Sequence, residues 1–342
     1  MLEPAAVSLG LAARRRTRDS RDEAVTRRRA LSGIRTRYAI SLACLGVLGG
    51  SPASADPYVA GAIDYPGASQ TWATGINNDG FIVGLYNKGN AESGAFVRSP
   101  DGAYYRIGGE GWVALGINNL GQIVGDAGTM FLRDPGGSVL HFDYPNATGR
   151  QANGLNDGEA IVGAYYVNSQ DSGAFIRFVD GSFGNFRYLG ASDTNAYGIN
   201  NVGQIVGQIN NGSLSYVRGS DGTFSAISFP EATQTQAFGI NNSGQISGTY
   251  YNPEVGTHGF VRDADGSFRQ VDISSSSSPK VHTIVWGIND SGLVAGYFVA
   301  EGGDRTRGLI GYPLPEPRKH VGLMAGTLGL VVLASARRRQ KR

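Results

Sequence analysis

Short apolar runs alternate with tight polar turns along most of the chain. The stretch "AFGINNSGQISGTYY", which begins at Ala237, has an apolar run, an Asn-, Ser- and Gly-rich turn, and a second apolar run. This order is typical of a β-hairpin. Nearly the same text begins at Trp72 and again at Val113. The pattern therefore predicts a series of similar hairpins.

A Gly-(Ile/Leu)-Asn triplet marks each repeat. The triplet begins at Gly75, Gly116, Gly154, Gly198, Gly239 and Gly287. Successive triplets are 38 to 48 residues apart. A period of this size is typical of repeated supersecondary units that stack on one another.

Each unit contains four β-like runs, which we call a to d. In the first unit, runs a and b are "WATGIN" and "FIVGLY", and runs c and d are "GAFVRS" and "AYYRIG". Four strands in about 40 residues is the content of a β-propeller blade. The six units therefore predict an all-β fold, a β-propeller of six four-stranded blades, which we favour over an open β-solenoid.

The two ends of the repeat region complement each other. The last unit has runs a, b and c but no run d, because Pro313 ends it. A run that resembles d, "GAIDYPGA" at residues 61–68, precedes the first unit. We expect residues 62–65 to pair with residues 308–312, because an N-terminal strand would then close the ring and cover a sheet edge.

The Asn of each triplet is expected to end run a and to set the following turn, since Asn tolerates turn conformations and caps them. Calcium binding by this turn is disfavoured, because the position of Asp79 holds Leu120 and Val202 in other units.

The Gly inside run b, such as Gly84, indicates a close approach of another backbone. The His residues lack metal-ligand spacing, so no cofactor or metal is expected.

Charge is sorted along the chain. Residues 1–55 have ten Arg against four acidic residues, and residues 318–342 have seven Lys and Arg and no acidic residue. Residues 56–317 have 13 Lys and Arg against 24 Asp and Glu. Nucleic-acid binding requires a basic surface, so the acidic middle argues against it.

The first 55 residues are predicted to be a signal peptide. An apolar run, "YAISLACLGVLGG", begins at Tyr38 and is followed by the small residues Ala53, Ser54 and Ala55. Small residues at this point are typical of a signal-peptidase site. We expect cleavage before Asp56, which would remove the only cysteine and leave a mature chain without disulfides.

Residues 314–342 are predicted to be a C-terminal anchor that forms an apolar helix. The motif Pro315, Glu316, Pro317 precedes an uncharged, mostly apolar run at residues 321–336, and a basic tail follows. The run is short for a membrane-spanning helix, which needs about 20 residues. The basic tail is typical of the cytoplasmic end of such a segment.

The three parts in this order resemble the PEP-CTERM sorting signal of Gram-negative bacteria. The resemblance implies transient or lasting membrane insertion, and removal of the signal by an exosortase during export to the cell surface or extracellular matrix. The repeats "GINNDGFIVG" at Gly75 and "GINNVGQIVG" at Gly198 resemble those of the bacterial extracellular HAF family. That resemblance covers residues 57–313 and implies an exported repeat fold, the propeller domain at 56–313, but no particular activity.

A ligand is expected on the end of the ring that carries the b–c and d–a connections, because their sequences differ freely between units and binding residues concentrate on variable loops. Aromatic residues gather there, and aromatic rings can stack on sugars. The candidate ligand-binding residues are Tyr86, Trp112, Tyr165, Tyr166, Tyr250, Tyr251 and Tyr297. The alternative is that half of them fill the space between blades.

The sequence thus favours an exported, non-enzymatic binding or structural module of the cell surface or matrix, whose ligand would be an extracellular polysaccharide. One alternative is a secreted carbohydrate-active enzyme, which would bring two carboxylates together at one mouth of the ring. Another is a scaffold for a protein partner, which would have an exposed apolar patch.

Overall fold

A computed structural model describes residues 58–314 except 90–91, 169–170, 274–280 and 301–304. The predicted signal peptide with Ala53, Ser54 and Ala55, and the predicted apolar helix after Pro315, lie outside these residues. In the described part of the chain, no helix combines the length and the apolar character needed to cross a membrane.

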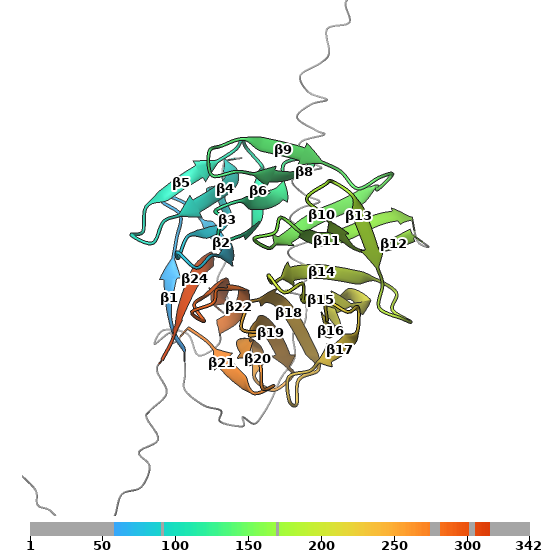
Figure 1. Cartoon of the computed structure of the whole chain (residues 1–342). Helices are drawn as coiled ribbons and strands as arrows, with labels where there is room; N and C mark the ends of the chain where they lie inside the picture. The colour runs from blue at the N-terminus through green and yellow to red at the C-terminus, as the bar shows by residue number, and fades with distance from the viewer. Residues whose placement is uncertain (1–57, 90–91, 169–170, 274–280, 301–304, 315–342) are drawn as a thin grey trace, which may run out of the picture.

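The described chain folds into six four-stranded antiparallel sheets around a central axis (Figure 1), which confirms the six-bladed propeller. Blade 1 consists of β2 (Gln70–Ile76), β3 (Ile82–Asn87), β4 (Ser93–Arg98) and β5 (Tyr104–Ile107). Blade 2 consists of β6 (Val113–Ile117), β7 (Ile123–Asp126), β8 (Met130–Arg133) and β9 (Val139–Phe142). Blade 3 consists of β10 (Gly149–Leu155), β11 (Ile161–Asn168), β12 (Asp171–Arg177) and β13 (Phe183–Phe186). Blade 4 consists of β14 (Thr194–Ile199), β15 (Ile205–Ile209), β16 (Leu214–Arg218) and β17 (Phe224–Ile227). Blade 5 consists of β18 (Gln234–Ile240), β19 (Ile246–Asn252), β20 (Gly256–Arg262) and β21 (Phe268–Val271). Blade 6 consists of β22 (Val281–Ile288), β23 (Val294–Ala300), β24 (Thr306–Pro313) and β1 (Tyr58–Ile63).

The first strand of each blade, strand a, lies at the axis. Strand a of every blade contacts strand a of the next blade, and β22 of blade 6 contacts β2 of blade 1. Strand d is the outermost strand of each sheet. The axis is therefore lined by the six strands that begin the repeats.

The N-terminal strand closes the ring, as predicted. β1 pairs with β24 from Tyr58 opposite Pro313 to Ile63 opposite Gly308, and the two strands lie side by side in Figure 1. The strand begins and ends earlier than expected, so Tyr65 does not pair with β24. Residues 65–68 form a turn instead, in which the amide of Ala68 donates to the carbonyl of Tyr65 over 3.0 Å.

The two ends of the ring differ in their connections. The a–b and c–d turns form one end, which we call the asparagine face, and the b–c and d–a connections form the other, the loop face. The Tyr58 hydroxyl donates to the carbonyl of Gly292, in the a–b turn of blade 6, over 2.9 Å. Both ends of the described chain, at Tyr58 and after Pro313, therefore leave together from the asparagine face.

The interior of the blades depends on the glycine of strand b. A Cβ at Gly84 would lie 2.0 Å from the carbonyl oxygen of Trp72 on strand a and 2.9 Å from the ring of Phe96 on strand c. Strand a has a register shift beside this contact, between Ala73 and Gly75. The predicted close backbone approach is thus present, and strand a of the same blade makes it.

Candidate functional site

The triplet asparagines set the a–b turns, as predicted. The side-chain oxygen of Asn118 accepts hydrogen bonds from the amides of Leu120 (3.1 Å) and Gln122 (2.8 Å). Its side-chain nitrogen also reaches the next blade and donates to the carbonyl of Asn156 over 3.1 Å. Each asparagine therefore shapes its own turn and binds the neighbouring blade.

These inter-blade bonds form a closed circle, which we call the inner belt. Each side-chain nitrogen donates to the backbone carbonyl of the equivalent asparagine in the next blade, over 2.9 to 3.3 Å. The members are Asn77, Asn118, Asn156, Asn200, Asn241 and Asn289. The last bond runs from Asn289 to Asn77, so the belt ties blade 6 to blade 1 as firmly as any other pair.

The residues that follow form a second circle, the outer belt. Here a side-chain oxygen accepts from the backbone amide of the equivalent residue in the preceding blade, over 2.8 to 2.9 Å. The members are Asn78, Asn119, Asp157, Asn201, Asn242 and Asp290. The sequence repeat predicted the turns, but not that they bind one another around the axis.

The two carboxylates of the outer belt stand three blades apart, and each accepts from both neighbouring blades. Asp157 receives the side-chain nitrogens of Asn119 (3.0 Å) and Asn201 (2.6 Å). Asp290 receives those of Asn78 (2.7 Å) and Asn242 (2.9 Å). Burial raises the pKa of Asp290, but the hydrogen bonds from the two asparagines outweigh it, and its pKa lies below the ordinary value.

An axial channel of two successive cavities lies inward of the two belts. A cavity of about 80 Å³ lies between the belts and a ring of Ile and Leu side chains that includes Ile76 and Leu155. A second cavity, of about 70 Å³, continues past the triplet glycines. Pockets for small organic ligands have volumes of roughly 300 Å³ or more, so these cavities suit water rather than a sugar.

The triplet glycines allow the six inner strands to approach closely. A Cβ at Gly154 would lie 2.5 Å from the carbonyl oxygen of Tyr197 and 3.2 Å from the Cα of Gly198. A Cβ at Gly287 would lie 3.1 Å from the Cα of Gly75, where the ring closes. Any larger residue would push two blades apart at the axis.

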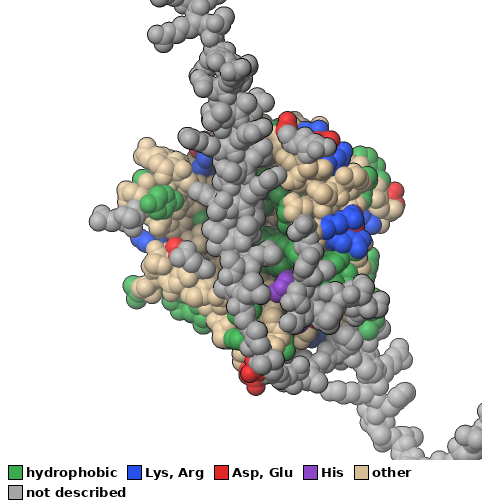
Figure 2. All heavy atoms as spheres, turned by 180° about the vertical axis from the view of Figure 1, so that it is seen from behind, with side chains coloured by type: hydrophobic (Ala, Val, Ile, Leu, Met, Phe, Trp, Pro, Cys, Tyr) green, Lys and Arg blue, Asp and Glu red, His purple; other side chains and the backbone are tan. Residues whose placement is uncertain are grey.

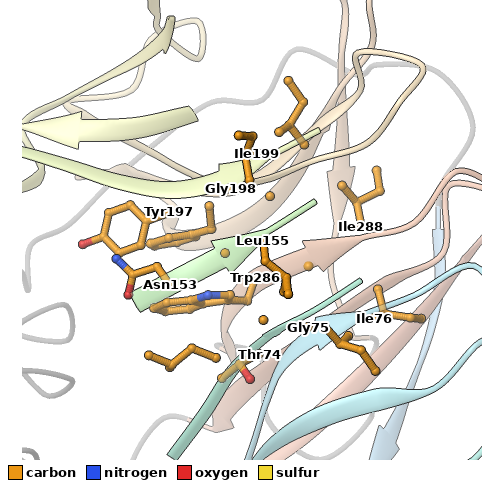
Figure 3. Close-up of a pocket in the computed structure, with 18 residues that line it drawn as sticks. Thr74, Gly75, Ile76, Asn153, Leu155, Tyr197, Gly198, Ile199, Trp286 and Ile288 are labelled. Atoms are coloured by element: carbon orange, nitrogen blue, oxygen red, sulfur yellow. The ribbon is translucent and has the colours of Figure 1, made fainter. Parts of the chain in front are cut away.

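The channel is filled toward the loop face by the residues that precede the triplet glycines. The rings of Phe238 and Trp286 stack with centroids 4.3 Å apart, and Tyr197 meets Trp286 edge to face at 5.9 Å. Thr74 and Asn153, both labelled in Figure 3, and Leu115 complete this layer of six side chains. The layer is an aromatic plug, which sequence inspection missed because it is made of six different residue types at one repeat position.

Four of the predicted ligand-binding tyrosines are core residues. Tyr86, Tyr165, Tyr250 and Tyr297 are between 1% and 7% exposed. Tyr165 stacks on Tyr144 with ring centroids 4.0 Å apart, and the ring faces of Tyr86 and Tyr250 are covered in the same way. These four rings have no face left for a sugar, because neighbouring side chains cover nearly all of their surface.

The other three candidates reach the surface to different extents. Tyr166 is 47% exposed at the loop-face end of β11, and Tyr251, at the equivalent place in blade 5, is half-buried. Trp112 is half-buried on the d–a connection of blade 1, where its ring lies 4.8 Å from that of Phe131. Tyr166 and Tyr251 belong to different blades, so the structure places them at equivalent positions rather than in one shared pocket.

The d–a connections are less variable than expected. Four of them contain a four-residue turn that begins with an aromatic residue and ends with Ala. In each turn the amide of the Ala donates to the carbonyl of the aromatic residue over 3.0 to 3.2 Å. The turns are at residues 65–68, 144–147, 188–191 and 229–232. The third residue has a positive φ in each, and Pro is second in three of them, which is typical of a type II turn. The aromatic residues of three of these turns, such as Phe229, cover the buried tyrosines of strand b.

The described residues contain no group of three or more His, Cys, Asp or Glu that could hold a metal ion. Seen from behind, the charged side chains that the described chain shows lie in small groups toward the rim (Figure 2).

Comparison with known proteins identifies the fold. No family model and no curated protein matches the chain. Among solved structures, it is similar to a luciferin-regenerating enzyme, with a TM-score of 0.52, 9% identity, and 76% of this chain and 96% of the other covered. A putative gluconolactonase gives a TM-score of 0.50 at 11% identity, covering 76% and 94%. The calcium-binding protein regucalcin from Agrobacterium tumefaciens gives 0.48 at 11% identity, covering 78% and 99%. At these identities the likeness concerns the propeller fold alone.

Proposed function

We propose that the protein is an exported binding propeller that attaches to extracellular polysaccharide through its loop face and performs no catalysis. The fold of the described chain is a six-bladed propeller, and such a ring serves equally well for enzymes and for binding modules. The choice between the two depends on what each face offers a ligand.

The difference between the two faces carries the proposal. On the asparagine face, the two belts use the turn amides and the Asn and Asp side chains to bind blade to blade. Groups already paired in this way must break good hydrogen bonds before they can bind anything else. The loop face has no such belt among the described residues, and Tyr166 lies there with 47% of its surface exposed.

Tyr166 is held in a way that suits stacking. Its backbone carbonyl accepts from the amide of Thr148, in the preceding connection, over 2.8 Å. The Thr148 hydroxyl donates to the same carbonyl over 3.2 Å. The main chain beneath the ring is therefore fixed, so a sugar that stacks on the ring orders little besides itself.

The direction of the chain ends fits attachment at the cell surface. The chain leaves the asparagine face after Pro313, two residues before the proposed Pro315-Glu316-Pro317 sorting motif. A protein held through that end, before or after exosortase processing, would turn the loop face away from its point of attachment. The polysaccharide would then meet the free face.

A glycan array with the purified protein tests the proposal. We expect binding to a class of extracellular polysaccharide without any change in its chain length. Shortened products in the incubated samples would instead support the carbohydrate-active enzyme. If no glycan binds and a protein from the same envelope does, the scaffold function replaces the proposed one.

A further inference from the structure

Blade 5 has a histidine between its b–c loop and the end of its outermost strand, β21. The loop, residues 253–255, joins β19 to β20, and His258 lies on β20 opposite Tyr250. The imidazole Nδ1 is 2.8 Å from Oδ2 of Asp272, which directly follows β21. Its Nε2 is 3.0 Å from the carbonyl oxygen of Val255, within the loop.

Each ring nitrogen of His258 therefore faces an acceptor, and Nδ1 also lies 3.3 Å from the side-chain nitrogen of Gln270, a donor on β21. A carboxylate and a backbone carbonyl each require a donated proton, and only the imidazolium can donate from both nitrogens at once. A neutral His258 can keep one of the two bonds and must lose the other. The protonation state of this ring thus decides whether the loop is bound to the carboxylate of Asp272.

The surroundings of His258 supply one counter-charge. Its titratable contacts in the described chain are Asp272 and Tyr250, whose ring centroid lies 5.5 Å away. Tyr250 donates its hydroxyl to Gln270 over 3.0 Å, and the Gln270 side chain donates to Asp272. The second oxygen of Asp272, Oδ1, is buried without a hydrogen-bond partner. A buried carboxylate of this kind favours a cation beside it.

Blade 6 contains the same arrangement with a permanent cation. Arg307 faces Phe298 at the position where His258 faces Tyr250. Its Nε and a terminal nitrogen are 2.9 and 2.8 Å from Oδ2 of Asp64, which directly follows the outermost strand β1. Asp64 also has a buried Oδ1 without a partner. Two blades thus place a cation and an Asp at one structural position, and only one of the cations titrates.

We propose that His258 is a pH-sensitive latch, which holds the b–c loop of blade 5 to Asp272 when protonated and releases the loop when neutral. The loop follows Tyr251 on the loop face, and Asn252 extends the latch to the d–a connection that precedes blade 5 by donating to the carbonyl of Glu231 over 3.0 Å. The latch therefore sets the shape of this part of the loop face. It stands whether or not the face binds a polysaccharide.

The direction of the effect follows from the pKa. Burial lowers the pKa of His258, but the hydrogen bond and charge of Asp272, together with the Val255 carbonyl, outweigh burial and raise it above 6.5. The latch therefore contributes stability that is complete below pH 6.5 and is lost as the pH rises through the pKa of the folded state.

Hydrogen exchange of the amides of residues 254–257, corrected for intrinsic rates, tests the proposal on the purified protein. We expect protection to fall about tenfold when His258 deprotonates, as for the loss of a hydrogen bond to a charged group. His258→Arg, which copies blade 6, should keep its protection at both pH values, and His258→Gln should lack the pH step.

Asp272→Asn is the second variant, because it removes the charge and keeps the shape. The NMR titration of His258, with His141 and His282 as references, should then move down toward its ordinary value. The latch is overturned if wild-type protection does not change across the titration, if His258→Arg shows the wild-type pH step, or if Asp272→Asn leaves the His258 titration in place.

Discussion

The side-chain amide of Asn289, in the last blade, donates to the carbonyl of Asn77, in the first, over 3.0 Å and across 212 residues of sequence. The same bond joins every other pair of neighbouring blades. The ring is thus closed at its rim by the pairing of β1 with β24 and around its axis by both belts. Repeats that close on themselves leave no terminal unit exposed.

The inner belt should contribute strongly to stability. Asn118→Ala removes the oxygen that accepts from two turn amides and the nitrogen that donates to the carbonyl of Asn156. Asn118 is only 4% exposed, so its partners lose these hydrogen bonds inside the protein. We expect the free energy of unfolding to fall by about 2–4 kcal/mol, because buried partners lose their hydrogen bonds. Guanidinium unfolding measures this. Asn185→Ala, on the exposed side of β13, is the control and should change stability by less than about 0.5 kcal/mol.

The glycines at the axis should tolerate no side chain. In Gly154→Ala the new Cβ would meet the backbone of Tyr197 and Gly198, which cannot rotate away. We expect a loss of about 3 kcal/mol or more, or failure to fold, since two blades must separate. The matched control is Gly61→Ala on β1, where no atom lies within 4 Å of the new Cβ. Equal melting temperatures for the two variants would contradict the close approach of the inner strands.

The outer belt should weaken in acid. The lowered pKa of Asp290 means that its stabilising effect is present above pH 3.8 and is lost as the pH falls through the pKa of the folded state. Asp290→Asn should lose about 1–3 kcal/mol at neutral pH, because its amide would face the donors of Asn78 and Asn242. It should also show less acid destabilisation than the wild type below pH 3.8. Urea unfolding at both pH values measures this; parallel pH profiles would count against the belt.

The repeat made the fold predictable. Turn residues recur at a fixed place in each unit, as in Asn77 to Gly80, and they fix hairpin phase and strand number without any knowledge of tertiary contacts. Closure was also predictable, since Pro313 leaves the last unit without run d. The exact bounds of β1 were not, because the turn after it includes Tyr65 and shortens the strand at that end.

The candidate site was harder to predict. Tyr165 and Tyr166 are adjacent in sequence, and strand alternation shows that they point in opposite directions without showing which of them points outward. The belts depend on ring geometry, which brings together turns about 40 residues apart. The repeated aromatic turns were visible in "DYPGAS", "DYPNAT" and "SFPEAT", but their role of covering the strand b tyrosines requires the structure.

The two tyrosines should therefore respond differently to truncation. Tyr165→Ala empties a site in the core where the ring stacks on Tyr144, and we expect it to cost about 3–5 kcal/mol. Tyr166→Ala removes a ring that is half in solvent and should cost less than about 1 kcal/mol. Thermal unfolding of both variants checks this. A larger loss for Tyr166→Ala would move Tyr166 into the core and take from the loop face its main exposed ring.

The affinity of Tyr166→Ala for the polysaccharide found on the array tests the central claim most directly. Leu120→Ala is the matched control, because Leu120 is 58% exposed on the asparagine face. Loss of one stacked ring should weaken binding by about fivefold to tenfold, while Leu120→Ala leaves the affinity unchanged and both variants unfold within a few degrees of the wild-type temperature. Binding that survives Tyr166→Ala but is lost in Leu120→Ala would contradict the account and place the ligand on the opposite face.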